Sequence, residues 1–168
     1  LRRPLAAGAV VVFGLLSFLS RDAIAGYEQI PAFKPIAENG AAAISFLNAE
    51  GLTRGYAGYW SSHALTLRSG LKVHFYPVGP CRRPVSDMLC PFYVNVRTAW
   101  YRPVRAKTFL LTDGVESGGL TEPPPPALGL PEKVRRFGSL TVYVYPVDIA
   151  GHFLPPCPGE HVCPGEPS

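Results

Sequence analysis

Seventeen consecutive residues near the start of the chain, 4–20, carry no charge, and most of them are apolar. A helix over this stretch is apolar on every side, so it must be buried all round, in lipid or as an export signal. At 1.5 Å per residue it spans roughly 26 Å, near the lower limit for a bilayer core of about 30 Å. Arg2 and Arg3 precede the stretch and Arg21 follows it. The positive-inside rule then predicts that everything after Arg21 lies outside the cytoplasm.

Three interpretations of this N-terminal segment remain open. We expect residues 1–25 to form a retained transmembrane helix, which makes membrane lipid a partner and anchors the chain in the cell membrane by a single pass. The sequence Ala23-Ile24-Ala25 before Gly26 also fits the small-x-small pattern of a cleaved signal peptide. The third interpretation is a core helix of a soluble domain. The first two both export the rest of the chain, to the cell surface, the periplasm or the medium.

Cysteine spacing agrees with export. Eight residues separate Cys81 from Cys90, and five separate Cys157 from Cys163. Neither spacing matches the two to four residues typical of structural zinc sites, so we expect no metal. In an oxidising compartment two local disulfides are the simpler outcome, although four cysteines allow three pairings and free thiols remain an alternative.

Composition narrows the class of protein. Hydrophobic residues make up 47% of the chain, which excludes wholesale disorder. The 19 prolines and 17 glycines among 168 residues require short elements and exclude a helical bundle. The net charge is +4, but from residue 26 onward 13 Lys and Arg face 11 Asp and Glu. A net charge of only +2 over these residues attracts phosphate backbones weakly, so we expect no nucleic-acid partner.

Hydrophobic periodicity predicts an α+β domain over residues 26–154. Apolar residues at spacings of three and four favour a helix over 36–50, and Gly51 sits where a helix C-terminal cap requires a left-handed residue. Alternating patterns favour strands, and turn chemistry at 68–71 makes the first two a hairpin. The expected strands cover 62–67, 72–78, 107–112 and 139–145. The sum is a small, mainly antiparallel sheet of four or five strands, followed by a Pro- and Cys-rich flexible tail, 155–168.

Catalytic motifs are missing from the sequence. It contains no Gly-rich phosphate loop, His-Glu-x-x-His or Gly-x-Ser-x-Gly. Ser62 and His63 are adjacent, and neighbouring residues on the expected strand point to opposite faces, so they would not share a proton. A carboxylate dyad of Asp113 and Asp148 would have to assemble from distant loops. An independent hydrolase is therefore the least favoured function, and we expect neither a catalytic residue nor a cofactor.

Two aromatic clusters are the candidate binding residues. The first comprises Tyr56, Tyr59 and Trp60, and the second begins with Trp100 and Tyr101. Flat amphipathic rings beside polar groups can stack on sugar faces, so these side chains and Arg102 are candidate carbohydrate contacts. The alternatives are that the rings complete a small core or lie at the bilayer interface, where Tyr and Trp accumulate.

A basic stretch overlaps the second cluster. It comprises Arg97, Arg102, Arg105 and Lys107. Its interpretations are a solvated face, a contact with anionic lipid, or a site for a phosphate-bearing ligand.

Several of these segments together resemble a known region. The first segment is the block Leu-Asn-Ala-Glu-Gly-Leu-Thr-Arg-Gly-Tyr-Ala-Gly-Tyr-Trp at 47–60. The further segments lie at 65–70, 73–78, 100–101, 108–110, 137–138 and 142–145. In order and spacing they resemble the C-terminal extracytoplasmic region of bacterial integral-membrane glycosyltransferases that use polyprenyl-phosphate sugars. The resemblance extends from about residue 15 to residue 148.

The resemblance implies a non-catalytic role. In that family the catalytic acidic residues lie in an early extracytoplasmic loop between transmembrane helices, and none of them matches a position of this sequence. The chain would be the tail portion of such an enzyme, or a stand-alone relative of it, unable to transfer sugar alone. The resemblance therefore implies a domain that holds a cell-envelope glycan, a lipid-linked sugar or a partner near the membrane. A secreted, disulfide-stabilised binding protein is the alternative, produced by cleavage near Ala25.

Overall fold

A computed structural model describes residues 34–81, 88–92, 97–114, 120 and 122–153. The chain divides into two compact units, residues 1–34 and 35–168, and all described residues except Lys34 belong to the second. The expected N-terminal helix, the tail 155–168, Cys157 and Cys163 lie outside the described residues. Within the described part, no helix combines the length and the hydropathy that a membrane crossing requires.

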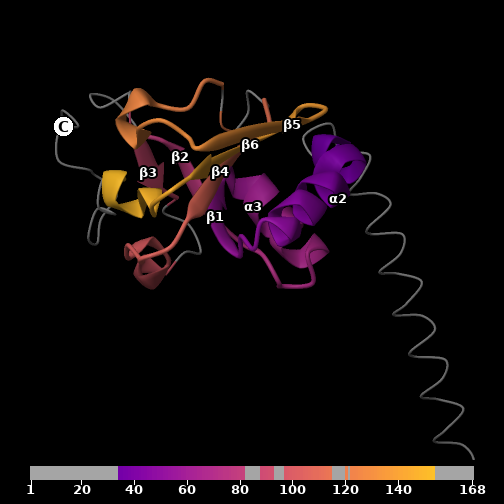
Figure 1. Cartoon of the computed structure of the whole chain (residues 1–168), viewed down its shortest axis with the longest axis horizontal. Helices are drawn as coiled ribbons and strands as arrows, with labels where there is room; N and C mark the ends of the chain where they lie inside the picture. The colour runs from indigo at the N-terminus through magenta and orange to yellow at the C-terminus, as the bar shows by residue number, and fades with distance from the viewer. Residues whose placement is uncertain (1–33, 82–87, 93–96, 115–119, 121, 154–168) are drawn as a thin grey trace, which may run out of the picture. The chain divides into compact units, whose positions relative to one another are not determined.

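The fold is α+β, as the sequence predicts (Figure 1). Two α-helices and six strands are formed by the described residues: α2 (Lys34–Ala49), β1 (Arg54–Ala57), α3 (Tyr59–Arg68), β2 (His74–Pro80), β3 (Leu89–Pro91), β4 (Thr108–Thr112), β5 (Lys133–Phe137) and β6 (Leu140–Tyr145). Three short 3-10 helices join them: η2 (Thr98–Tyr101), η3 (Pro126–Leu128) and η4 (Ile149–His152). The helix expected at 36–50 and the strands expected at 72–78, 107–112 and 139–145 are confirmed as α2, β2, β4 and β6.

The sheet differs from the expected one. It has six strands rather than four or five, in the order β3-β2-β1-β4-β6-β5. It is mixed, because β1 lies parallel to both β2 and β4, while the other three pairings are antiparallel. The centre of the sheet is thus parallel and its two flanks are antiparallel.

The strand predicted at 62–67 is wrong, because these residues belong to the helix α3. Apolar and polar residues alternate along this segment, but buried and exposed side chains do not. Leu65 is fully buried, while Leu67 is 71% exposed. The buried positions Ser62, Leu65 and Ser69 recur at three and four residues, which is the helical period. The predicted hairpin is therefore also wrong. Since β1 and β2 are parallel, they need a crossover connection, and α3 supplies it.

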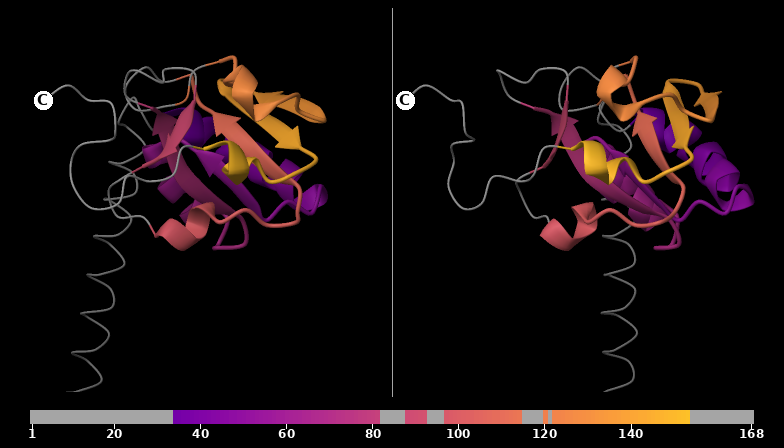
Figure 2. Two further views of the ribbon diagram at one scale, coloured as in Figure 1. Left: turned by 90° about the vertical axis from the view of Figure 1, so that its left-hand side faces the viewer. Right: turned by 60° about the vertical axis from the view of Figure 1, so that its left-hand side comes forward.

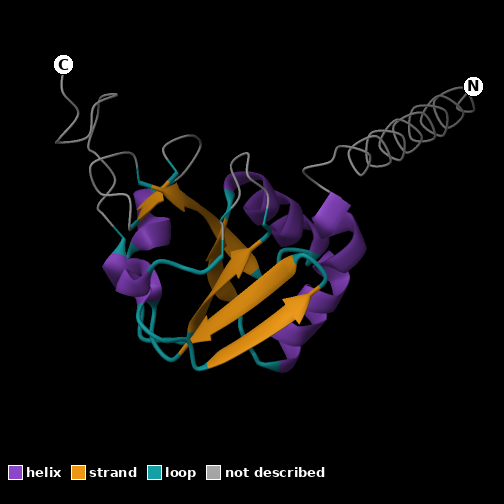
Figure 3. Ribbon diagram, turned by 90° about the horizontal axis from the view of Figure 1, so that it is seen from above, coloured by secondary structure: helices purple, strands orange, loops and turns teal. Residues whose placement is uncertain are grey.

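The sheet is covered differently on its two faces (Figures 1 and 3). One face, here the helix face, carries the α-helices: Phe46 of α2 contacts Phe137 of β5 with ring centroids 5.7 Å apart. The opposite face, here the turn face, is covered by η2, η3 and η4. A buried hydrophobic cluster on this face includes Tyr56 and Leu110 of the sheet. Each 3-10 helix contributes to it: Tyr101 from η2, Leu128 from η3 and Ile149 from η4. Figure 2 shows the layers from two further directions.

Two glycines are required at specific positions, one by a helix cap and one by a close approach. Gly51 has a φ of +68°, and the Leu52 amide donates to the Leu47 carbonyl at 2.8 Å, so the predicted C-terminal cap of α2 is confirmed. In the centre of the sheet the Phe109 ring lies over Gly55, where a Cβ atom would come within 2.4 Å of it. The same ring meets Phe75 edge-on at 5.0 Å. Three neighbouring strands are thus joined through one aromatic contact on the helix face.

Candidate functional site

The candidate carbohydrate contacts lie on two surfaces, one at each end of β1. Tyr59 and Trp60 follow the carboxyl end of β1, at the start of α3. The carbonyls of Trp100 and Arg102 accept hydrogen bonds from Arg54, the first residue of β1. A four-residue strand is about 13 Å long, so one sugar ring does not touch both surfaces. Tyr56 lies within β1 itself, between them.

A buried carboxylate organises the amino-terminal surface. The Asp148 side chain is 1% exposed and lies 3.7 Å from the Arg54 guanidinium. It accepts hydrogen bonds from the Tyr56 hydroxyl at 2.8 Å, the Val104 amide at 2.9 Å and the Ala150 amide at 3.0 Å. Burial of a charge requires such partners. The carboxylate therefore fixes β1, the loop after η2 and the start of η4 relative to one another.

Arg54 extends this network to the aromatic side chains. Its guanidinium lies 4.9 Å from the centroid of the Tyr76 ring, which suits a cation–π contact. Trp100 stacks on Tyr76 with centroids 5.4 Å apart and an angle of 23° between the rings. His74 is parallel to Tyr76 at 6.3 Å. Arg54, Tyr76 and Asp148 were not sequence candidates for this surface, and they position the Trp100 ring at its edge.

Two of the candidate tyrosines face inward. Tyr56 is completely buried and Tyr101 is 7% exposed, and the Tyr101 hydroxyl donates to the Pro77 carbonyl at 2.6 Å. Burial raises the pKa of both phenols well above 10, and for Tyr56 the hydrogen bond to Asp148 adds to the effect. These hydroxyls are engaged inside the domain. The side chains of the second cluster that reach its surface are the half-buried Trp100 and the exposed Arg102.

The buried phenols predict a loss of stability at alkaline pH. Burial also raises the pKa of Tyr145, to about 12. Because the folded state holds these protons above pH 10 and the unfolded state releases them, the free energy of unfolding falls as the pH rises through that range. Denaturant titrations at increasing alkaline pH, read beside tyrosinate absorbance, measure both effects. A free energy of unfolding that stays constant from neutral pH to pH 12 contradicts the prediction.

The carboxyl-terminal surface is built around Tyr59. Its ring meets Trp60 edge-on at 5.0 Å, lies 4.8 Å from His63 and packs on Phe92 at 4.4 Å. Trp60 itself is 51% exposed. Packing on three sides fixes Tyr59, whereas half of the Trp60 surface stays in contact with water. This surface thus presents a large aromatic side chain on a rigid support.

A buried carboxylate also lies at this end of the sheet. Asp113 follows β4, and the Ser61 hydroxyl in the first turn of α3 donates to it. The side chains are almost fully buried, with exposures of 5% and 1%. The carboxyl edge of parallel strands and the N-terminus of a helix favour anions, but Asp113 already supplies that charge. A phosphate would meet a like charge here, so the geometry argues against a phosphate site.

The hydrolase candidates are not arranged for catalysis. The Tyr59 carbonyl accepts hydrogen bonds from the Ser62 hydroxyl at 2.7 Å and from His63 Nδ1 at 2.8 Å. Since a carbonyl only accepts, Nδ1 carries a proton and cannot take one from Ser62, 3.2 Å away. Our strand-based reason for separating the pair was wrong, because both belong to α3.

The carboxylate dyad considered from the sequence is not assembled either. Asp113 follows the carboxyl end of β4. Asp148 lies at the other end of that strand, where Thr108 donates to the Val147 carbonyl. A five-residue strand of about 16 Å separates the two carboxylates, more than either glycosidase geometry allows.

The predicted disulfide between Cys81 and Cys90 is present, with the Cα atoms 5.0 Å apart. It joins the residue after β2 to the middle of β3, and the Cys81 amide donates to the Met88 carbonyl beside it. The bond thus holds the short edge strand β3 on the sheet, next to the Tyr59–Phe92 contact.

Breaking this bond is expected to lower stability moderately. For a loop with a sequence separation of 9, loss of the restraint on the unfolded chain costs about 2–3 kcal/mol. The Cys81→Ser/Cys90→Ser variant, compared with the oxidised protein by urea unfolding, measures the loss. Equal free energies of unfolding for the two proteins would show that the bond does not constrain the domain.

Comparison with known proteins finds no match. No family model, no curated protein and no solved structure matches this chain. A proposal of function therefore rests on the sequence features and on the contacts of the described residues.

Proposed function

We propose that the chain is a non-catalytic, extracytoplasmic domain that is anchored in the cell membrane by residues 1–25 and contacts a cell-envelope glycan through Trp60. This is the role that its resemblance to the tail of membrane glycosyltransferases implies. The observation that carries the proposal is the Trp60 side chain, which folding leaves 51% exposed although Trp is among the side chains with most to gain from burial.

The proposed location is supported by two independent features. The uncharged stretch 4–20 between arginines favours export. The Cys81–Cys90 disulfide is typical of proteins in oxidising compartments. The two features lie in different parts of the chain, and each favours the outer side of the membrane.

The proposed contact is supported by the surroundings of Trp60. Tyr59 and Phe92 hold the base of the surface, and His63 lies exposed beside Tyr59. A half-exposed indole suits the apolar face of a pyranose ring, while imidazole and backbone groups bond sugar hydroxyls. Because these side chains are already packed, little ordering is needed when a ligand binds.

Substitution at Trp60 tests the contact. Trp60→Ala should weaken binding of the full chain to isolated cell-envelope polysaccharide by about tenfold, the loss of one aromatic contact. Trp60→Phe should retain part of the affinity. Binding is measured by titration calorimetry with the chain in detergent micelles, and thermal unfolding is measured on the same samples. The matched control is Leu67→Ala on the same helix, an exposed apolar side chain that should leave affinity unchanged.

Two results would contradict the contact. One is wild-type affinity in Trp60→Ala. The other is unfolding of Trp60→Ala, which would show that the indole serves the core.

The mass of the mature chain decides between anchored and secreted forms. Retention of residues 1–25 in the membrane fraction is the expected result. A product that begins at Gly26 in the soluble fraction would replace the anchored protein by the secreted binding protein.

A further inference from the structure

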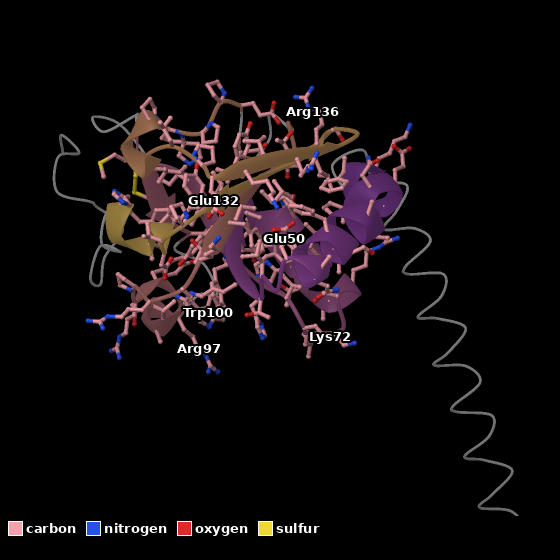
Figure 4. The ribbon with its side chains drawn as sticks, viewed as in Figure 1. Glu50, Lys72, Arg97, Trp100, Glu132 and Arg136 are labelled. Atoms are coloured by element: carbon pink, nitrogen blue, oxygen red, sulfur yellow. A yellow bond between two sulfur atoms is a disulfide. The ribbon has the colours of Figure 1, made fainter. Side chains whose placement is uncertain are left out.

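Several exposed cations lie at one end of the sheet. The register aligns Arg54 with His74 and Gly55 with Phe109, so the amino ends of β1, β2 and β4 coincide. The segments that lead into β2 and β4 therefore meet at this end, together with η2, which Arg54 holds there. The exposed cations of these segments form what we call the basic end: Lys72, Arg97, Arg102, Arg105 and Lys107. Figure 4 shows Lys72 and Arg97 projecting from the same side of the domain.

Most of this positive charge is not neutralised by carboxylates in the described part of the chain. Lys107 forms an ion pair with Glu132 at 2.7 Å. The Glu50 carboxylate forms an ion pair with Lys133 of β5, also at 2.7 Å. Asp148 is buried beneath Arg54. Within the described residues, Lys72, Arg97, Arg102 and Arg105 form no ion pair. The basic end thus presents four cations to its surroundings.

Apolar side chains are also exposed at this end of the sheet. Leu71 is 58% exposed, Val147 57% and Val104 40%. Leu71 has a φ of +62°, a conformation that is unfavourable for a branched side chain. Local strain and exposure to water both disfavour this leucine at the surface. Exposed cations and exposed apolar groups at one end, with the half-buried Trp100 beside Arg97 (Figure 4), match the composition of surfaces that bind at the bilayer interface.

We propose that the basic end docks on the surface of an anionic phospholipid bilayer. The proposal rests on the proposed function only for the nearness of a membrane. Charge complementarity selects the occupant, because unpaired Lys and Arg bind anionic headgroups while short apolar side chains enter the interface. Thirteen residues, 21–33, connect the uncharged stretch to α2, and thirteen residues reach at most about 45 Å. That reach is sufficient for any face of a domain this size to touch the membrane.

Docking at this end would orient the domain. Trp60 follows the carboxyl end of β1, whereas the basic end surrounds its amino end. A domain that rests on the bilayer by its basic end directs Trp60 away from the lipid, toward the cell envelope. The same arrangement gives the two surfaces of the site separate roles, lipid contact for Trp100 and glycan contact for Trp60.

The two tryptophans of the chain test this orientation directly. Trp60→Phe leaves Trp100 as the single fluorophore, and Trp100→Phe leaves Trp60. Each full-length variant is reconstituted into vesicles of phosphatidylcholine alone or of phosphatidylcholine and phosphatidylglycerol in equal parts, with a fraction of the lipid brominated. We expect bromine to quench Trp100 in the mixed vesicles only, and high salt to abolish the quenching. Trp60 should be unquenched in both.

Charge removal gives a second readout that leaves the aromatic side chains intact. Arg97→Gln/Arg102→Gln/Arg105→Gln should weaken docking by about two orders of magnitude, at about fivefold for each cation, and so remove the quenching of Trp100. The matched control is Arg135→Gln, an exposed cation on the edge strand β5, which should leave the quenching unchanged.

Several outcomes would overturn docking. Three of them concern the pattern of quenching: equal quenching of Trp100 in neutral and mixed vesicles, equal quenching of both tryptophans, or no quenching at all. The fourth is loss of quenching when inorganic phosphate is added at constant ionic strength, which would indicate a phosphate site. Loss of the anchor is distinguishable from these. A chain that floats with mixed but not with neutral vesicles contradicts the proposed anchor and leaves docking supported.

Discussion

Replacing Asp148 with alanine is expected to lower the free energy of unfolding by about 3–5 kcal/mol, because it leaves a partly buried cation without its counter-charge. The substitution also removes the acceptor of the Tyr56 hydroxyl and of two backbone amides, those of Val104 and Ala150. Each unsatisfied buried donor is unfavourable. Urea unfolding of the wild type and the variant, followed by tyrosine and tryptophan fluorescence, measures the difference.

Two further variants isolate the cause. Asp148→Asn keeps an acceptor oxygen but not the charge, so it should fall between wild type and alanine. Glu132→Ala removes an exposed carboxylate, 45% exposed in its pair with Lys107, and should cost less than about 1 kcal/mol. An Asp148→Ala variant as stable as Glu132→Ala would show that the network around Arg54 does not hold the turn face together.

Truncation of Phe109 is expected to have an effect of similar size on the opposite face. Phe109→Ala removes a completely buried ring, which costs about 3–5 kcal/mol. Gly55→Ala alone should also destabilise, by about 1–3 kcal/mol, because its Cβ would come within 2.4 Å of the Phe109 ring. In the double variant the new methyl group occupies part of the space that the ring leaves.

The double-mutant cycle measures this contact. The double variant should lose less stability than the two single losses added together, with a coupling above about 1 kcal/mol. Strict additivity would contradict the contact. Gly79→Ala is the matched control, because its nearest neighbour lies 3.8 Å from a Cβ atom, an ordinary van der Waals distance.

Elements with a strong period were predictable from the sequence, and weakly patterned ones were not. Along β6, Val142 and Val144 alternate with polar or aromatic neighbours, and the strand was expected. The strand β1 has four residues and includes Gly55, too few for a period to appear. The strand β5 reads Lys-Val-Arg-Arg-Phe; its charges suit an exposed edge strand but not the apolar alternation that identifies a strand.

The site was predictable as a list of aromatic residues but not as two surfaces. Tyr56 and Trp60 lie four positions apart in the sequence, yet one is buried and the other half exposed. The contacts that decide this are long-range, since 92 residues separate Tyr56 from Asp148. No local spacing encodes such a pair. The order β2-β1-β4, which sends the two clusters to opposite ends of β1, arises only when the sheet assembles.

The side of the membrane on which the folded domain resides is the central question, and protease protection answers it. Cells producing the full chain are converted to spheroplasts, and a protease that does not cross lipid is added. We predict that the region 34–153 is degraded while cytoplasmic marker proteins survive, and that Cys81 and Cys90 resist alkylation until a reductant is added. A domain that stays intact until detergent opens the cell, with both cysteines alkylated without reduction, would contradict the account.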